Sequence, residues 1–193
     1  MKGYSVLGVR SWVLGGICAL LFVAALAPAR SPFAPGDILL HISVQGRGEI
    51  VIKLFTKEAP RATAHIIALA KGGFYNGQRF YRVIRSPRPY LVQLGAPDSR
   101  TRPMDDPILQ GEGTGTKIPY EESGYSHDGA GMVGLSHQAT DKNSGDSQFY
   151  VLLAPAKFLD GSYTVFGKVV QGMSVLQGLE KGDTVSSAVV TTE

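Results

Sequence analysis

Along most of the chain, hydrophobic residues are concentrated in short segments, and turns rich in glycine and proline separate these segments. Within these segments apolar residues alternate with polar ones or form brief continuous runs, a pattern typical of β-strands. The first two segments, 37–44 and 48–55, flank the turn 45–47 and predict a hairpin. Further strands are predicted at 79–84, 90–94, 131–136, 147–153, 163–169 and 184–192.

Two segments have helical spacing instead. The first follows Pro60, a residue suited to a first helical turn, and ends at Gly72-Gly73. The second is predicted at 173–180, and the long stretch 96–129 is predicted to be a loop. Many strands with two helices indicate a mainly β fold, a closed barrel capped at its ends, because closure removes exposed strand edges. The apolar positions of the first helix are Ala59, Ala62, Thr63, Ile66, Leu69 and Ala70, and those of the second are Val175, Leu176 and Leu179.

The N-terminal residues 1–30 have a different pattern. Residues 11–29 carry no charge, and Lys2 and Arg10 precede them, as in a signal peptide or a signal anchor. Small residues at 27–29 predict cleavage after Ala29, but an apolar helix of this length also approaches the roughly 20 residues that span a bilayer. Both alternatives place the following domain across the membrane, in a periplasmic or other extracytoplasmic compartment. The predicted parts are the leader 1–30, a linker 31–36 and one domain, 37–193.

The charge of the chain belongs to this leader. The formal net charge is +3, and residues 1–30 contain three basic residues and no acidic one. The remaining 16 basic and 16 acidic residues balance, so a nucleic-acid partner is not expected. The single cysteine, Cys18, also lies in the leader. The predicted domain therefore has no disulfide and no thiolate nucleophile, which suits an oxidising compartment.

Motifs of other enzyme classes are incomplete. The histidines at 41, 65, 127 and 137 have no metal-ligand spacing, so neither a metal nor another cofactor is expected. Residues 134–138 lack the second glycine of a hydrolase nucleophile elbow. Residues 111–117 are rich in glycine but do not match a phosphate-binding loop.

A series of motifs occurs in a recognisable order along the chain. In the first half, Gly-Phe-Tyr-Asn-Gly at 73–77 is followed by Phe-Tyr-Arg-Val-Ile at 80–84. In the second half, Ser-Gln-Phe-Tyr at 147–150 precedes Phe-Leu-Asp-Gly at 158–161 and Val-Phe-Gly-Lys-Val at 165–169. From about residue 38 to residue 180 the chain resembles the cyclophilin-type peptidyl-prolyl cis/trans isomerases. The resemblance implies an eight-stranded antiparallel barrel capped by two helices.

The same resemblance assigns roles to individual residues. Arg82 resembles the catalytic arginine of the family, and Gln93 resembles the glutamine on the neighbouring strand. By the same resemblance, the pocket that receives the proline ring is formed by Tyr90, Leu91, Tyr150 and Leu159. Gln148 resembles the polar wall of that pocket. The full set of expected substrate contacts is Tyr90, Leu91, Ser136, His137, Gln148, Tyr150, Phe158, Leu159 and Tyr163.

These residue types suit rotation about an X-Pro bond. The barrier of ~18–20 kcal/mol comes from delocalisation of the nitrogen lone pair into the carbonyl. A guanidinium donor aimed at the nitrogen favours the twisted state, in which the lone pair has returned to it. An apolar, water-poor pocket strengthens that interaction and holds the proline ring.

The sequence departs from the family pattern at three places. The loop 85–89 is longer than usual, which leaves the register of Tyr90 and Leu91 open by one residue. Phe158 replaces the tryptophan that contacts cyclosporin in many eukaryotic members, so weak drug binding and a bacterial-like relative are expected. His137 replaces an asparagine, and we consider the hypothesis that it makes substrate binding sensitive to pH.

Six arginines, interspersed with acidic residues, favour a solvated face over an anion site: residues 79, 82, 85, 88, 100 and 102.

The expected function is isomerisation of X-Pro bonds in exported proteins by a monomer whose partners are proline-containing polypeptides. Residues 11–29 would contact the membrane if the leader stays attached. Two alternatives use the same fold: a non-catalytic module that binds proline-containing segments, and a general chaperone. The presence of Arg82 favours the enzyme.

Overall fold

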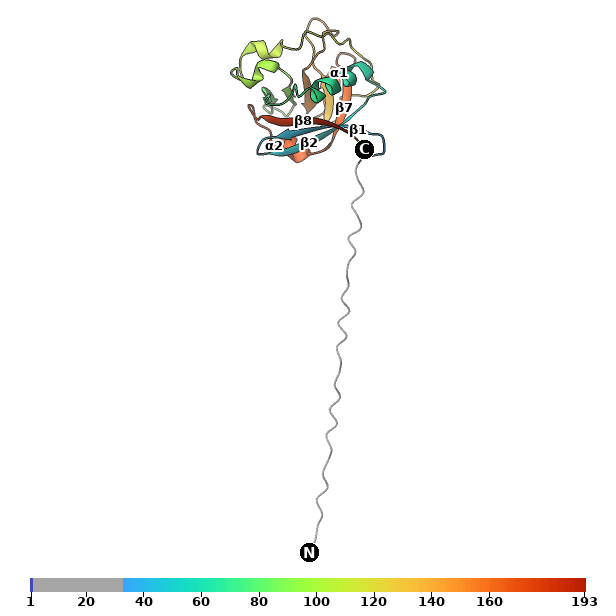
Figure 1. Cartoon of the computed structure of the whole chain (residues 1–193), viewed down its shortest axis with the longest axis vertical. Helices are drawn as coiled ribbons and strands as arrows, with labels where there is room; N and C mark the ends of the chain where they lie inside the picture. The colour runs from blue at the N-terminus through green and yellow to red at the C-terminus, as the bar shows by residue number, and fades with distance from the viewer. Residues whose placement is uncertain (2–32) are drawn as a thin grey trace. The chain divides into compact units, whose positions relative to one another are not determined.

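A computed structural model describes Met1 and residues 33–193, and its main element is one eight-stranded antiparallel sheet (Figure 1). The predicted leader and its apolar helix lie outside the described residues. The strand order is β3-β4-β6-β5-β7-β2-β1-β8. All eight predicted strands are present, several of them shorter than the sequence pattern indicated. Their bounds are β1 Ile38–Val44, β2 Gly48–Leu54, β3 Arg82–Ile84, β4 Leu91–Leu94, β5 Met132–Leu135, β6 Phe149–Leu152, β7 Val165–Gln171 and β8 Val185–Thr192.

The sheet curls into a half-barrel, and complete closure stays a prediction. Between the edge strands β3 and β8, the segments that precede them are joined by the isolated bridge of Arg79 with Thr184 and by backbone hydrogen bonds between residues 77–80 and 182–185. Gly77 and Gly182 lie at the two ends of this pairing, and both adopt a left-handed backbone, with φ of 76° and 100°, that glycine tolerates. Each of them still donates a backbone hydrogen bond across the seam, Gly77 to Val185 and Gly182 to Phe80, and strand β3 begins at Arg82.

Two helices complete the core. Helix α1 (Pro60–Lys71) contacts β8, and helix α2 (Met173–Gly178) contacts β2; they lie on different sides of β8 in Figure 1. The second helix is two residues shorter than predicted because Leu179 is already extended. Most of the predicted inner faces are buried: Ala59, Ala62, Thr63, Ile66 and Ala70 around α1, and Leu176 and Leu179 around α2. Leu69 and Val175, also predicted to face inward, are half-buried and pack against the core.

Strand β6 separates two apolar clusters on the opposite faces of the sheet. Phe149 and Val151 belong to the main core, which the two helices share. Tyr150 and Leu152 point to the other face and join a second cluster. Successive strand residues face opposite sides of a sheet, so this alternation follows directly from the sequence. The second cluster places the residues of the predicted site on the outer face of the curled sheet.

The loop predicted at 96–129 contains two short 3₁₀ helices, η1 (Pro97–Arg100) and η2 (Pro107–Gln110). Each begins at a proline, whose fixed φ suits a helical start. A third one-turn helix, η3 (Lys157–Leu159), carries part of the predicted pocket. None of the helices in residues 33–193 has the length and apolar character needed to cross a bilayer.

Candidate active site

Four residues form a row across the outer face of the sheet. Arg82 of β3 pairs with Gln93 of β4, and Gln93 pairs with Tyr150 of β6. Tyr150 in turn pairs with Gly134 of β5. Directly paired residues in an antiparallel sheet project from the same face. The pairing therefore brings the predicted guanidinium, amide and aromatic ring together, although 68 residues separate the first from the last.

The loop 85–89 does not disturb this alignment. The backbone amide of Tyr90 donates to the carbonyl oxygen of Ile84 at 3.0 Å, which closes the loop. Leu91 then pairs with Ile84, so that Gln93 faces Arg82. The register that the sequence left open by one residue is fixed by this pairing.

Gln93 connects the arginine to the rest of the site. Nη1 of Arg82 donates a hydrogen bond to Oε1 of Gln93 at 3.1 Å. Nε2 of Gln93 donates to Oε1 of Gln148 at 2.9 Å and to Oγ of Ser136 at 3.0 Å. Gln93 is 3% exposed, so its amide is held by these partners rather than by water. Its Oε1 is thereby turned toward the guanidinium.

Gln148 is the buried anchor of the network. Its Nε2 donates to the carbonyl oxygens of Leu109 and Glu112, each at 2.7 Å, and its Oε1 also accepts from the hydroxyl of Tyr81. Burial raises the pKa of Tyr81, so this hydroxyl remains a donor. The sequence analysis missed Tyr81, although it lies beside Arg82 in one of the recognised motifs. Gln148 thus ties the loop of η2 to the site.

The residues of the apolar pocket predicted from the sequence lie together in one cluster beside this network. Leu91, Tyr150 and Leu159 are buried in one cluster, with Tyr90 and Tyr163 packed against it. The rings of Tyr150 and Tyr163 meet edge to face, with centroids 5.7 Å apart. Offset and edge-to-face geometry is favoured between aromatic rings. The cluster offers an apolar surface next to the guanidinium.

Phe158 lies at the rim of the cluster rather than inside it. Its side chain is 74% exposed, and its ring centroid is 5.7 Å from that of Tyr90. An exposed ring beside a partly buried one leaves an apolar edge that a ligand could cover. The expected weakness of cyclosporin binding stays a prediction.

His137 joins two loops of the site. Its ring stacks on Tyr163, with centroids 4.0 Å apart. Its Nδ1 lies 2.8 Å from the carbonyl oxygen of Gln138, and its Nε2 lies 3.0 Å from that of Ser162. An imidazolium can donate to both oxygens, whereas neutral imidazole has one donor. This geometry supports the pH hypothesis for His137, which stays a prediction.

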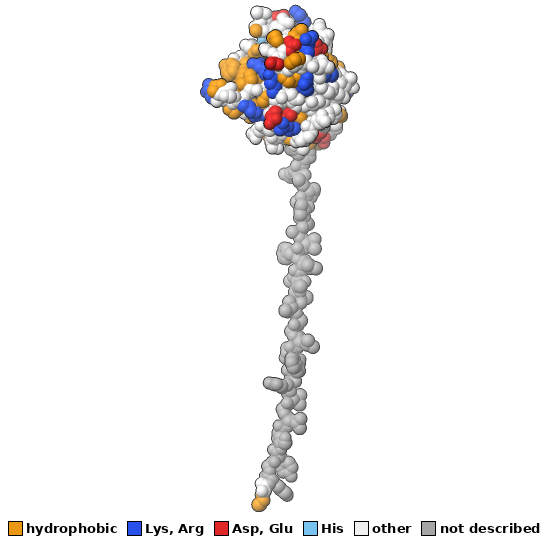
Figure 2. All heavy atoms as spheres, turned by 90° about the vertical axis from the view of Figure 1, so that its left-hand side faces the viewer, with side chains coloured by type: hydrophobic (Ala, Val, Ile, Leu, Met, Phe, Trp, Pro, Cys, Tyr) orange, Lys and Arg blue, Asp and Glu red, His pale blue; other side chains and the backbone are white. Residues whose placement is uncertain are grey.

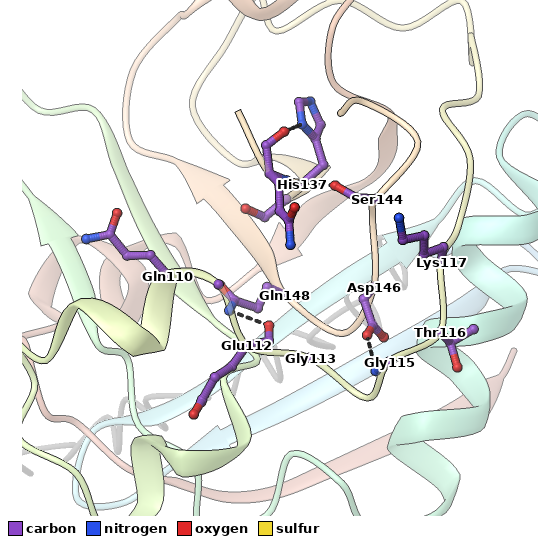
Figure 3. A pocket seen from close by; sticks show the side chains of 13 residues that line it. Gln110, Glu112, Gly113, Gly115, Thr116, Lys117, His137, Ser144, Asp146 and Gln148 are labelled. Carbon is purple, nitrogen blue, oxygen red and sulfur yellow. Dashed lines mark hydrogen bonds between the residues drawn. The ribbon is translucent and has the colours of Figure 1, made fainter. Parts of the chain in front are cut away.

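A hollow of about 130 Å³ adjoins the network and shares Ser136, His137 and Gln148 with it (Figure 3). Asp146 forms part of its wall and accepts from the backbone amide of Gly115 at 2.8 Å. Asp146 also accepts from Thr114 Oγ1 at 2.6 Å. The glycine-rich segment 111–117 therefore contains a turn that is held by a carboxylate.

The other arginines of the predicted cluster have different partners. Arg102 lies between Asp98 and Asp106, with N–O distances of 2.7 and 3.1 Å. Arg85 donates to two carbonyl oxygens at the end of α2. Figure 2 shows acidic and basic side chains interspersed on one face, as predicted for a solvated mixed surface. Arg82 forms no ion pair within residues 33–193, so its guanidinium remains available to a ligand.

Two further residues lie behind the pocket and were not assigned to it from the sequence. His127 is fully buried, and its Nε2 is 2.8 Å from the hydroxyl of Tyr150. Its Nδ1 is 2.7 Å from Oδ1 of Asp160. Asp160 follows Leu159 in a recognised motif, but nothing in the local pattern indicated a contact with His127, which is 33 residues away. Within residues 33–193, no three His, Cys, Asp or Glu side chains group as metal ligands would.

The sequence comparisons decide the family. The model of the family described as cyclophilin type peptidyl-prolyl cis-trans isomerase matches residues 39–193. The chain is a cyclophilin. Peptidyl-prolyl cis-trans isomerase ppi1 of Schizosaccharomyces pombe is 37% identical over 134 residues, which cover 66% of this chain and 76% of the relative. A peptidyl-prolyl cis-trans isomerase of Helicobacter pylori is 35% identical over 150 residues, covering 74% and 81%.

A solved structure shares the fold. It is a cyclophilin type peptidyl-prolyl cis-trans isomerase of Cryptosporidium parvum, determined in the presence of the dipeptide Ala-Pro. The TM-score is 0.68 at 20% identity, over 80% of this cyclophilin and 99% of that chain. The family and its sequence relatives make this cyclophilin a peptidyl-prolyl cis-trans isomerase.

Proposed function

We propose that this cyclophilin isomerises X-Pro bonds of exported polypeptides, with Arg82 as the catalytic donor and Gln93 as its partner. The observation that carries the proposal is the cross-strand row, in which only strand β4 separates Tyr150 from a guanidinium that has no ion pair within residues 33–193. The proline ring would occupy the apolar cluster, and the peptide on either side would follow the rim. Acting on one chain at a time, the protein would work as a monomer.

The chemistry requires no covalent step. As the X-Pro bond twists, the nitrogen becomes pyramidal and regains its lone pair, and a guanidinium N–H can then donate to it. An acceleration of about 10⁵ needs roughly 7 kcal/mol of transition-state stabilisation. One charge-assisted hydrogen bond supplies only about 1.5–3 kcal/mol. The apolar cluster around Leu91 and Leu159 supplies a water-poor site that strengthens this bond and holds the ring in place.

The test compares Arg82→Ala with the wild type on a peptide that contains one Ala-Pro bond. Both catalysed exchange and peptide affinity are measured by NMR. The wild type should accelerate isomerisation, and Arg82→Ala should lose about 10²–10³-fold in kcat/KM, the usual loss for a transition-state donor. Arg88→Ala is the matched control, because Arg88 is an exposed arginine on the loop 85–89. It should behave as the wild type.

The alternative function is a module that binds proline-containing segments without catalysis. It would be supported if the wild type and Arg82→Ala were both inactive while the peptide still bound to both. A general chaperone role is separable from catalysis by suppression of aggregation of a proline-free client, which isomerisation cannot explain. The first result contradicts the proposal, and the second adds an activity to it.

The extracytoplasmic location is part of the proposal and is supported by residues 1–30. Basic residues precede an uncharged apolar stretch, 11–29, and this stretch ends in small residues at 27–29. N-terminal sequencing of the protein from fractionated cells should give either a chain that starts at Arg30 or an intact chain in the membrane fraction. In the second case residues 11–29 contact the membrane. An intact chain in the cytoplasmic fraction would contradict the proposed location.

A further inference from the structure

Tyr150 carries a buried hydroxyl group within the apolar cluster that we propose as the proline pocket. The residue is 3% exposed, and its hydroxyl bonds to His127, which is 0% exposed. His127 bonds in turn to Asp160. The three side chains form a continuous chain of hydrogen bonds from the pocket to the surface, which we call the relay. The isomerisation chemistry above makes no use of this chain.

The direction of each hydrogen bond in the relay follows from Asp160. Its carboxylate also accepts from the backbone amide of His127 at 2.8 Å and from the hydroxyl of Ser126. Burial alone would raise the pKa of Asp160, but these hydrogen bonds lower it to about 2. An ionised carboxylate only accepts, so Nδ1 of His127 carries the proton. In neutral His127 the Nε2 then accepts, and the hydroxyl of Tyr150 donates to it.

This arrangement fixes the aromatic ring as well as the proton. A phenol ring turns about two side-chain bonds, and a hydrogen bond at its far end restricts both. The ring of Tyr150 lies across Gly134, and its edge-to-face contact with Tyr163 depends on that orientation. Among the described residues, the hydroxyl has no second partner.

The relay also reaches the opposite wall of the pocket. Asp160 directly follows Leu159, and the carbonyl oxygen of His127 accepts from the backbone amide of Ala156 at 2.8 Å. His127 therefore connects the strand that carries Tyr150 to the segment 156–160 that carries Leu159. The buried imidazole of His127 therefore fixes the separation between Tyr150 and the segment that carries Leu159.

We propose that His127 is a positioning residue for proline binding, acting through the hydroxyl of Tyr150. It orients the floor of the pocket so that the proline ring meets the ring face at a fixed distance from Arg82. The proposal rests on the proposed pocket. It assigns to His127 an effect on KM and on peptide affinity, and little effect on the catalytic constant once substrate is bound.

Two substitutions separate the two hydrogen bonds of His127. His127→Asn places an amide donor near Nδ1, which preserves the bond to Asp160 and removes the one to Tyr150. His127→Gln places an amide oxygen near Nε2, which preserves an acceptor for Tyr150. Tyr150→Phe removes the hydroxyl itself. His41→Asn is the control, because His41 is a partly buried histidine on β1 that bonds to Thr191.

The measurements are KM, kcat and the Kd of an Ala-Pro peptide, with the free energy of unfolding of each variant. His127→Asn and Tyr150→Phe should each raise KM and Kd about 2- to 10-fold, the effect of one neutral hydrogen bond. The double variant should equal Tyr150→Phe. His127→Gln should retain most of the wild-type affinity, and His41→Asn all of it. Differences in unfolding free energy alone would not give this pattern.

The proposal is overturned if His127→Asn and Tyr150→Phe leave KM and Kd unchanged, or if their effects add in the double variant. Additivity would mean that His127 does not act through the hydroxyl. If the wild type binds the peptide but does not isomerise it, the proposed function fails. The relay is then still judged by the Kd values.

Discussion

Arg82 and Gln93 face each other across β3 and β4, with Nη1 of the guanidinium 3.1 Å from Oε1 of the amide. Gln93 is itself held by Gln148 and Ser136, so the acceptor cannot turn away. A neutral acceptor orients the guanidinium without neutralising it. This relationship gives Arg82 a defined direction and leaves its charge for the substrate.

The first prediction concerns Gln93→Glu. A carboxylate at this position would form an ion pair with Arg82 and compete with the substrate nitrogen for its donors. It would also lose the amide donor to Gln148 and Ser136. We expect kcat/KM for an Ala-Pro peptide to fall roughly 10- to 100-fold, corresponding to about 1.5–3 kcal/mol for a hydrogen bond to a charged group. Unchanged activity would show that the neutrality of position 93 is unimportant.

The second prediction concerns Gly134→Ala. A Cβ atom at position 134 would overlap the Cζ and Oη atoms of Tyr150, which lie in the space that the glycine leaves. The ring must then move, and overpacking of this kind costs about 1–3 kcal/mol of unfolding free energy. We expect both lower stability in urea and a higher KM. Gly178→Ala is the control, since no heavy atom lies within 4 Å of the added Cβ.

The third prediction concerns the pH dependence of stability. Hydrogen bonds from Ser126 and His127 outweigh burial and lower the pKa of Asp160 from its ordinary 3.8 to about 2. A carboxyl group with a lowered pKa stabilises the folded state at pH values above its ordinary pKa. That contribution to the free energy of unfolding is lost as the pH falls toward the pKa of the group in the folded state. The difference in unfolding free energy between wild type and Asp160→Asn should therefore be constant above about pH 5 and shrink between pH 4 and pH 2. Denaturant titrations at fixed pH measure it. A difference that does not vary over this range would contradict the lowered pKa.

The fourth prediction concerns Phe158→Trp. Because Phe158 is exposed at the pocket rim, an indole can replace it without repacking the core. The added N–H supplies the donor that phenylalanine lacks. Cyclosporin affinity should rise roughly 2- to 10-fold, the worth of one neutral hydrogen bond, while kcat/KM for the peptide changes little. Phe158→Leu, which has no donor, should not show the gain. Equal affinity in all three proteins would mean that the rim does not contact the drug.

Much of the fold was predictable because alternation and helical spacing are local properties. The two faces of β6 follow from the alternation of side chains along any strand. The first helix follows from its proline, its terminal glycines and its apolar spacing, and the second from its apolar spacing. Complete closure was not predictable in this way. It depends on how far the segments before β3 and β8 pair in space, and these segments lie about 100 residues apart in the chain.

The sequence by itself determined the main residues of the site, Arg82, Gln93, Gln148 and Tyr150, through their resemblance to the family pattern, but not Tyr81, His127 and Asp160. The tertiary structure alone decided how they meet. The register of Gln93 depends on the hydrogen bond that closes the loop 85–89, and the contact of Tyr150 with His127 joins β6 to a loop. Such contacts depend on how segments that are far apart in the sequence lie in space. The pattern of residues within each segment does not specify the distance between the two segments.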